Sequence, residues 1–326
     1  HRIRFLVGDP VVYLEFCDAP GNIDRLLIVR DIELDRAKRL AAADRFACPA
    51  DFAPTEGLSG NRETATAQAA AQCLSARGLT QVTVDRTLPM IYVEMLRRRG
   101  IEVRCDEEWE IMDRRAKDAQ EIIHLQKAQR VTEIVMARAC TTIARCSSDA
   151  QGRLLHEGQI LTSEKMRTWI DTWLLEFGFS NPESIVACGP IGADCHDHGH
   201  GPLQTAQPII VDIFPRDKAT LYHGDCTRTV VHGRPTNDLV RMHEAVVAAK
   251  HAATNAIRSG VTGHEVHQVT CRIMHEYGFA MGFPPEGAPD CFTSMTHGTG
   301  HGLGLEVHEP PLLADRGHPL VVGDVL

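Results

Sequence analysis

The sequence lacks long apolar runs, a targeting pattern and an excess of basic residues. No apolar stretch approaches the roughly 20 residues of a membrane-spanning helix, and residues 1–8 carry charges without the cleavage pattern of a signal peptide. Acidic side chains outnumber basic ones by 43 to 34, and this net charge of −9 repels polyanions. We therefore expect neither a membrane nor a nucleic acid as partner. An initiator methionine is also missing, which suggests a fragment or a processed chain.

Cysteine is present without a pattern. The 11 cysteines form no CxxC pair, have no regular spacing and are odd in number, so neither a disulfide framework nor a zinc ribbon is expected. A reducing cytoplasm is the simplest compartment. Histidine, by contrast, is concentrated, because 15 of its 17 occurrences lie at or beyond His156. Chemistry is therefore expected in the C-terminal half of the chain.

Residues 1–110 predict a small α/β domain in which short β-branched runs alternate with helical ones. No cluster of reactive side chains occurs there. The expected strands cover residues 11–16, 26–29, 82–84 and 101–104, and the expected helices cover 33–43 and 64–76.

Residues 111–326 predict a second domain that begins with a long amphipathic helix near Asp113. Another helix should start at residue 162 or 163 and end at Gly178, with Trp169, Trp173 and Phe177 on one stripe, and its two tryptophans are expected in the core. Further predicted elements are helices from 236 or 237 to 260 and from 262 to 278, and two apolar strands, 208–214 and 221–231, joined as a β-hairpin.

The hairpin brings two aspartates together. If its turn is centred between Lys218 and Ala219, Asp212 directly faces Asp225. Like charges opposed between apolar strands destabilise the pairing unless a counter-charge or a raised pKa compensates. A divalent metal ion, or a proton shared by the two carboxylates, would provide that compensation. Alternatively, one aspartate faces solvent or pairs with Arg228, and a slip of one residue in the turn would separate the carboxylates.

The second group of candidate residues is the run from His297 to Glu309, HGTGHGLGLEVHE. Its alternating glycines allow a neighbouring strand or a ligand to approach the backbone closely. If the run is extended, His297 and His301 share one face, whereas His308 needs a twist or a bulge to join them. Imidazoles bind transition metals and exchange protons near neutral pH, so they would complement a paired-carboxylate site. The alternative is a structural or flexible loop.

Two other histidine groups are weighed against this one. A predicted helix face presents His264, His267, Cys271 and His275, but the opposite stripe with Val266 is the one expected to be buried. We therefore expect the histidines of that helix to face solvent rather than to hold a metal. The glycine-rich loop of residues 196–200 contains three more histidines before the acidic strand, and at least one of them is expected to contact substrate.

The stretches 209–229, IIVDIFPRDKATLYHGDCTRT, and 296–311, THGTGHGLGLEVHEPP, resemble the metallopeptidases of the creatinase, prolidase and methionine aminopeptidase group. The resemblance is greatest to the Xaa-Pro aminopeptidase and prolidase branch, and it is specific from about residue 185 onward. It implies an α+β fold, with a pita-bread catalytic domain over residues 111–326. Over residues 1–110 only the architecture is similar, to the family's smaller α/β N-terminal domain, which often takes part in dimerisation.

The resemblance implies a centre of two metal ions. Asp212 matches the aspartate that chelates one ion, Asp225 the aspartate that bridges both, and His301 the histidine ligand of the second. The family's ions are commonly Mn²⁺, with Co²⁺, Zn²⁺ or Fe²⁺ in some members, and hard carboxylate ligands with one imidazole suit Mn²⁺. Two glutamate ligands of the family follow a Gly-Asp-Val-Leu pattern, and this sequence stops at that pattern with Leu326. We therefore expect the natural protein to continue, and the 326-residue chain itself to bind metal weakly and to be inactive.

The implied activity is hydrolysis of the bond between an N-terminal residue and proline, with a hydroxide that bridges the two ions as nucleophile. His297 and His308 match histidines that contact the substrate and stabilise the tetrahedral intermediate. His196 matches a histidine that lines the pocket beyond the scissile bond. The expected partners are a peptide with proline at its second position and a second copy of the chain in a homodimer.

Two other functions are compatible with the sequence. The same fold supports non-peptidase enzymes, such as a creatinase-like amidinohydrolase or a lyase, and it also supports relatives that have lost the site and act as interaction modules. Retention of Asp212, Asp225 and His301 favours a metal-dependent enzyme, because an enzyme without metal has no reason to oppose two carboxylates.

Overall fold

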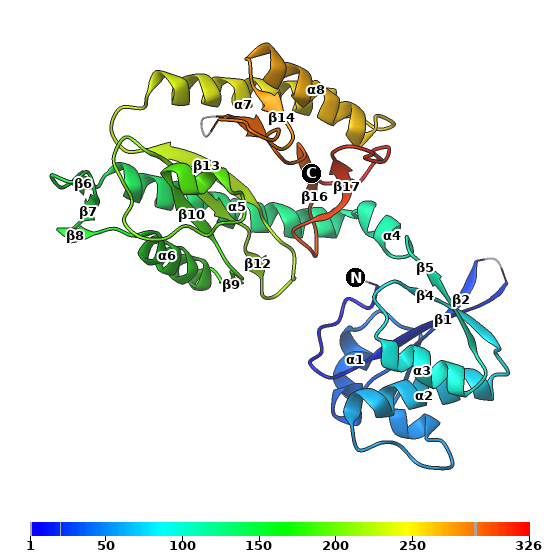
Figure 1. Cartoon of the computed structure of the whole chain (residues 1–326). Helices are drawn as coiled ribbons and strands as arrows, with labels where there is room; N and C mark the ends of the chain where they lie inside the picture. Colours follow the sequence, from blue (N-terminus) through cyan, green and yellow to red (C-terminus); the bar gives the residue numbers. More distant parts are fainter. Residues whose placement is uncertain (1, 20, 290–291) are drawn as a thin grey trace. The chain divides into compact units, whose positions relative to one another are not determined.

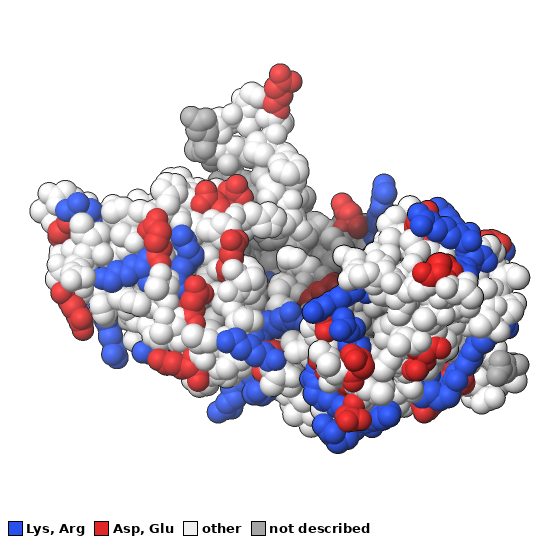
Figure 2. Space-filling model, turned by 90° about the horizontal axis from the view of Figure 1, so that it is seen from below, with Lys and Arg blue, Asp and Glu red and all other residues white. Residues whose placement is uncertain are grey.

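The computed structural model describes residues 2–19, 21–289 and 292–326, and the chain divides into two compact units, His1–Asp113 and Arg114–Leu326 (Figure 1). Strands and helices occur in both units, as an α+β chain requires. In the described part of the chain, no helix combines the length and apolarity that crossing a bilayer requires. On the face shown in Figure 2, lysine and arginine are mixed with aspartate and glutamate.

The first unit is built from a three-stranded sheet, a parallel strand pair and helices. All the predicted strands and helices of this unit are present, and α3 and β3 are additional to them. The sheet comprises β1 (Val12–Ala19), β2 (Asn22–Ile28) and β3 (Arg45–Ala47), the pair comprises β4 (Gln81–Asp85) and β5 (Glu102–Asp106), and the helices are α1 (Leu34–Leu40), α2 (Arg62–Ala76) and α3 (Met90–Arg98), with 3-10 turns at Asp31–Glu33 and Pro49–Phe52.

The core of the second unit lies under an antiparallel sheet of β10 (Ile185–Cys188), β11 (Pro208–Ile213) and β13 (Cys226–Val231), with β11 in the middle. Ile209, Val211 and Ile213 alternate along β11 and are fully buried. They pack with α5 (Ala119–Ala144) and α6 (Ser163–Glu176), which lie beside the sheet in Figure 1. Because side chains alternate along a strand, Asp212 projects from the opposite face.

The predicted register of the two aspartate-bearing strands is wrong by two residues. Asp212 faces Thr227, and Asp225 lies immediately before β13 begins. The connection is not a tight turn, because β12 (Arg216–Asp217) leaves the hairpin and pairs with β9 (Phe179–Ser180). A shift of two residues keeps the parity of the side chains, so Asp212 and Asp225 still belong to the same face.

The second unit also contains helices and short strand pairs outside this sheet. α7 and α8 pack against each other, and α8 also contacts β17. These elements are the meander β6 (Ser147–Ser148), β7 (Leu154–His156) and β8 (Gln159–Ile160), the 3-10 turn Gly189–Ala193, helices α7 (Asn237–Ala256) and α8 (Gly263–Glu276), and the pairs β14 (Ala280–Met281) with β15 (Ser294–Met295) and β16 (Gly300–Gly302) with β17 (Glu309–Leu313). The short helix α4 (Ile111–Arg115) spans the boundary between the two units.

Local capping signals place the helix starts. Thr162, Thr236 and Thr262 are the N-caps of α6, α7 and α8, as predicted, and each side chain accepts a backbone N–H of the first turn. The long helix begins at Ala119 rather than near Asp113, because Asp118 forms a capping box with Glu121. The residues just before it form the separate short helix α4.

One expectation about burial is confirmed and another is wrong. Phe177, the third residue of the stripe, is 45% exposed because it lies at the C-cap of α6, beyond the last buried turn. Trp173 is buried and Trp169 packs against the core. His267 was expected to face solvent, yet it is 8% exposed, because the helix buries it against the chain segment that precedes β16.

Candidate metal centre

Asp212 is held by its neighbour across the sheet. Its Oδ1 accepts a hydrogen bond of 2.6 Å from the hydroxyl of Thr227. Burial raises the pKa of Asp212, and the hydrogen bond from Thr227 and the charges of His301 and His308 oppose that rise. The carboxylate is therefore desolvated but kept close to groups that favour its charged form.

Asp225 is placed by α5. The side-chain oxygen of Gln129 accepts the backbone N–H of Asp225 at 3.0 Å, and the chain can approach the helix there because residue 224 is glycine. A Cβ on Gly224 would lie 2.7 Å from the carbonyl oxygen of Ala128. Burial and the adjacent charge of Asp212 raise the pKa of Asp225 to about 6, and His301 partly offsets this.

His301 and His308 meet at a bulge between β16 and β17. The pairing shifts between His301 and Gly302, and the two imidazole rings lie edge to face with their centroids 4.3 Å apart. A bulge is what His308 requires in order to join His301, and the glycines permit it. A Cβ at Gly302 would lie 2.5 Å from the carbonyl oxygen of Pro310, and one at Gly304 would lie 2.2 Å from Oε1 of Glu309.

The histidine pair reaches the aspartates. Nε2 of His301 lies 3.4 Å from Oδ2 of Asp225, with about a quarter of each side chain exposed. Burial and the charges of His301 and His196 lower the pKa of His308, while Asp212 opposes this effect. At neutral pH His308 is therefore an uncharged imidazole that can accept a proton.

Two buried ion pairs hold the chain that follows His308. Arg115 donates to both carboxylate oxygens of Asp324, at 2.8 and 2.7 Å, and neither side chain is more than 4% exposed. Lys117 pairs with Glu309, the residue after His308, and this pair is also buried. Breaking a buried pair leaves an uncompensated charge, so the Lys117 pair anchors the start of β17 and the Arg115 pair anchors the segment around Asp324.

The structure does not bring His297 into this group. It is exposed, and its Nδ1 lies 2.8 Å from the carbonyl oxygen of its neighbour Gly298. In the part of the chain that the structure describes, no hydrogen bond, ion pair or ring contact joins His297 to the aspartates or to His301. The charge of His297 acts instead on His267, whose Nδ1 lies 2.9 Å from the hydroxyl of Thr299.

Three potential ligand atoms come within 4.8 Å of one another in one place among the described residues, at Asp194, Cys195 and His196. This group is exposed and lies in the loop before β11. The ligand atoms of Asp212, Asp225 and His301 do not all lie within 4.8 Å of one another. Their chemistry nevertheless fits a hard divalent ion, because two desolvated carboxylates with a single adjacent imidazole leave an excess of negative charge that a cation would neutralise.

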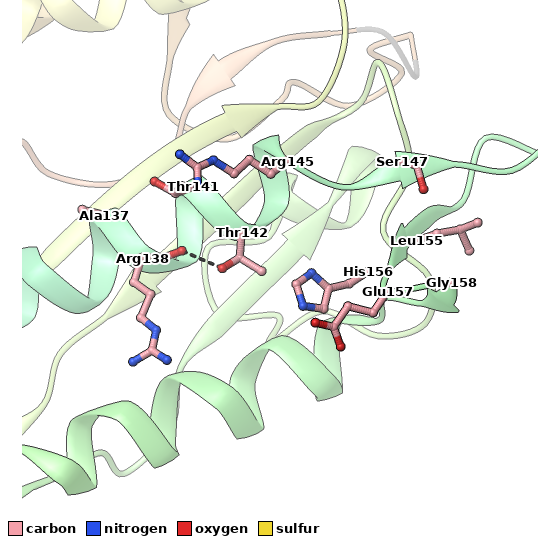
Figure 3. A pocket seen from close by; sticks show the side chains of 10 residues that line it. All are labelled: Ala137, Arg138, Thr141, Thr142, Arg145, Ser147, Leu155, His156, Glu157 and Gly158. Carbon is pink, nitrogen blue, oxygen red and sulfur yellow. Dashed lines mark hydrogen bonds between the residues drawn. The ribbon is translucent and has the colours of Figure 1, made fainter.

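A surface hollow of about 740 Å³ lies between the C-terminal end of α5 and the β6–β7 hairpin (Figure 3). None of the six predicted site residues lines it. Figure 3 shows the guanidinium groups of Arg138 and Arg145 on different sides of α5, so they do not converge on one ligand. This hollow is not the candidate site.

Several residues that shape the site had no signal in the sequence. Gln129 lies on a helix about a hundred positions before the aspartate that it holds, and Thr227 is one of two threonines on β13. His267 belongs to a helix face that the apolar pattern assigns to solvent. The alternation along β13 is the one signal that could have singled out Thr227, once the true register is known.

Comparisons with known proteins identify the family to which the chain belongs. Residues 124–326 match the model of metallopeptidase family M24. The chain is 36% identical over 140 residues to a probable dipeptidase PepE of Mycobacterium tuberculosis, and 32% identical over 137 residues to an Xaa-Pro dipeptidase of Lactobacillus delbrueckii subsp. lactis. These matches cover 42% and 41% of this chain, and they span 33% of the length of each relative.

Solved structures have a similar fold. The Xaa-Pro dipeptidase from Bacillus anthracis superposes with a TM-score of 0.76 at 20% sequence identity, covering 98% of this chain and 79% of its own. Prolidase from Pyrococcus furiosus superposes with a TM-score of 0.70 at 19% identity, covering 92% of this chain and 77% of its own. The predicted pita-bread α+β fold is confirmed by this likeness.

Proposed function

Since the chain belongs to metallopeptidase family M24, we propose that the protein is a metal-dependent exopeptidase that hydrolyses the bond between an N-terminal residue and proline. Two divalent ions are held by Asp212, Asp225 and His301, together with the glutamates that the family resemblance implies. The substrate class is supported by the Lactobacillus delbrueckii relative, which is named an Xaa-Pro dipeptidase. Oxygen-rich ligation favours Mn²⁺.

The observation that carries this proposal is the pair of desolvated carboxylates next to an imidazole. The charge of Asp212 helps to raise the pKa of Asp225 to about 6, and Nε2 of His301 lies 3.4 Å from the same carboxylate. A shared proton would also relieve the repulsion, but membership of a metallopeptidase family favours a metal.

The histidines provide proton transfer and substrate contacts. Bound divalent ions supply Lewis acidity and an activated water. His308, uncharged and in contact with His301, accepts or returns a proton at its imidazole nitrogen. His196 contacts the substrate residue beyond the scissile bond. For His297, a substrate contact rests on the family resemblance alone.

The assay measures release of the first residue from an Xaa-Pro-Xaa tripeptide and an Xaa-Pro dipeptide with and without Mn²⁺. It uses the chain continued through the two glutamates that the resemblance implies. Loss of a metal's outer-shell partner costs about 10- to 100-fold, so Asp225→Ala should lose at least about 100-fold. Asp315→Asn, whose side chain is 77% exposed, is the matched control and should keep full activity. No cleavage by a folded sample shown to contain metal would exclude the proposal.

We also propose that the protein is a homodimer and that it acts in the cytoplasm. This is supported by the family resemblance of residues 1–110, a domain that often takes part in dimerisation, and by cysteines without a disulfide pattern. Analytical ultracentrifugation tests the dimer directly, and a single monomeric species at micromolar concentration would contradict it.

A further inference from the structure

The loop that carries His196 is hydrogen-bonded to an arginine of α6. Nη1 of Arg167 donates to the carbonyl oxygens of His198 and Gly199, the latter at 2.6 Å. The carbonyl of His198 also accepts the backbone N–H of Val186, at 3.1 Å. One half-buried guanidinium therefore ties the loop to a place where it already bonds to β10.

The loop passes very close to β10 at Gly199. This residue has a φ of 76°, and a Cβ would lie 1.9 Å from the carbonyl oxygen of Val186. Only glycine fits such a conformation and such an approach. The tight passage turns the carbonyls of residues 198 and 199 toward α6, where Arg167 meets them.

The end of the loop is held by the first turn of the same helix. Oε1 of Glu164 accepts the backbone N–H of Gly201 at 3.0 Å, and the backbone N–H of Ser163 donates to the carbonyl oxygen of Gly201 at 2.9 Å. With the hydroxyl of Thr162, the Gly201 contact lowers the pKa of Glu164 to about 2. α6 therefore holds residues 198–201 through both carbonyl and N–H groups.

The three histidines of the loop are thereby given different surroundings. His198 lies 2.8 Å from Glu183 through Nε2, and its Nδ1 faces the carbonyl oxygen of Ser184 at 3.4 Å. His200 lines a separate hollow. His196 is the one whose charge reaches His308, and its backbone N–H donates to Asp194 at 2.9 Å.

We propose that Arg167 is a positioning residue for the pocket beyond the scissile bond. By clamping residues 198 and 199 against β10, it sets the place of His196 and with it the affinity for the substrate residue that follows the cleaved bond. The assignment of that substrate residue rests on the proposed function, whereas the clamp on the loop does not.

Replacing Arg167 removes the hydrogen bonds to the carbonyl oxygens of His198 and Gly199. A guanidinium donates charge-assisted hydrogen bonds to both oxygens at once, and methionine of similar length donates none. Without Arg167 the carbonyl of Gly199 has lost its donor and the loop can move. Because His196 contacts a part of the substrate that binds alike in the ground state and the transition state, its displacement raises KM and leaves kcat nearly unchanged.

The test compares Arg167→Met and Arg167→Lys with the control Arg138→Met. Arg138 lies on α5, stacks on Trp173 and lines the hollow of Figure 3, away from every predicted site residue. Backbone hydrogen exchange of residues 194–201, in the full protein without substrate, should quicken about tenfold in Arg167→Met. KM for an Xaa-Pro peptide should rise about tenfold, with kcat changed less than about twofold. Arg167→Lys should recover part of both effects, and Arg138→Met should show neither.

The two readouts separate this proposal from the proposed function. If the wild type cleaves no Xaa-Pro peptide, the proposed function fails, and the exchange of residues 194–201 still decides whether Arg167 is a clamp. Unchanged exchange in Arg167→Met overturns the clamp. Faster local exchange with unchanged KM overturns the role in substrate affinity. Faster exchange throughout residues 114–326, or a fall in kcat equal to the rise in KM, shows general loss of packing and also overturns the proposal.

Discussion

The aspartates and the histidines of the candidate site come from two regions of the second unit that are packed very differently. The β10–β11–β13 sheet, with α5 and α6, belongs to one cluster of 20 buried apolar residues among those described. Among the described residues, the region of α7, α8 and the β16–β17 pair has two clusters of four and shares a third, of three residues, with α5 through Leu303. The carboxylates therefore lie on the well-packed sheet region, here called the platform. The imidazoles lie in the region with small apolar clusters, here called the thin region.

α7 shows how thin the second region is. Its buried positions are Ala245, Ala249 and Ala253, whereas Val246 is 55% exposed and Met242 is 37% exposed. The apolar side chains of this helix are therefore only partly covered in the described structure. The histidines are held by close contacts at glycines and by the buried Lys117–Glu309 pair, together with a small apolar cluster that includes Leu303. The lesson is that one site can combine a ligand set held by packing with one held mainly by polar contacts.

The largest expected difference between the two regions is in how much a cavity lowers the free energy of unfolding. Leu174 of α6 is fully buried in the large cluster, and Met274 of α8 is 7% exposed in a small one. Leu174→Ala should lower the free energy of unfolding by about 3–5 kcal/mol, and Met274→Ala by about 2 kcal/mol, because a thin region can relax around the gap. Urea unfolding of both variants measures this. Equal costs would remove the contrast.

Metal should stabilise the thin region more than the platform. At a concentration 100 times its dissociation constant, an ion adds about 2.7 kcal/mol to the folded state. We expect Mn²⁺ to slow backbone hydrogen exchange mainly over residues 297–313, because the ion ties His301 to carboxylates that are already rigid. Exchange over residues 208–213 serves as the internal control. A uniform change in both segments would contradict the comparison.

The pH dependence of the free energy of unfolding tests the electrostatics of Asp225 in the metal-free protein. Folding raises the pKa of Asp225 from 3.8 to about 6. A carboxyl that binds its proton more tightly in the folded state stabilises that state at low pH, and this stabilisation is lost as pH rises through about 6. Relative to Asp225→Asn, the wild type should lose roughly 2 kcal/mol between pH 4 and pH 7. Urea titrations at both pH values measure it, and a constant difference would mean that the charge is already compensated.

The smallest effect concerns the support of Asp212 on the platform. Thr227→Val removes the hydroxyl that donates to Oδ1 of Asp212 at 2.6 Å, and it should cost about 1 kcal/mol. Thr229→Val, on the same strand and of the same parity, is the control and should be nearly neutral. Thermal unfolding of the two variants gives the comparison, and similar shifts for both would show that the hydrogen bond contributes nothing.

Short-range chemistry made much of this protein predictable from its sequence. Helix starts at Thr162, Thr236 and Thr262 follow from side-chain capping, which involves only the next three residues. The common face of Asp212 and Asp225 follows from strand alternation, and a shift of two residues leaves it unchanged. The need for a bulge before His308 could join His301 follows from the same parity argument.

Contacts between distant segments decided the rest. The register of β11 and β13 depends on β12 pairing with β9, more than thirty residues earlier in the chain. His267 is buried where Thr299 lies against it, and the loop of residues 196–200 is held by Arg167 of α6, a helix that precedes it in the chain. Local pattern fixes which face of an element a side chain occupies, since that depends on the backbone period alone. What the face meets depends on how the elements pack, and only the tertiary structure determines that.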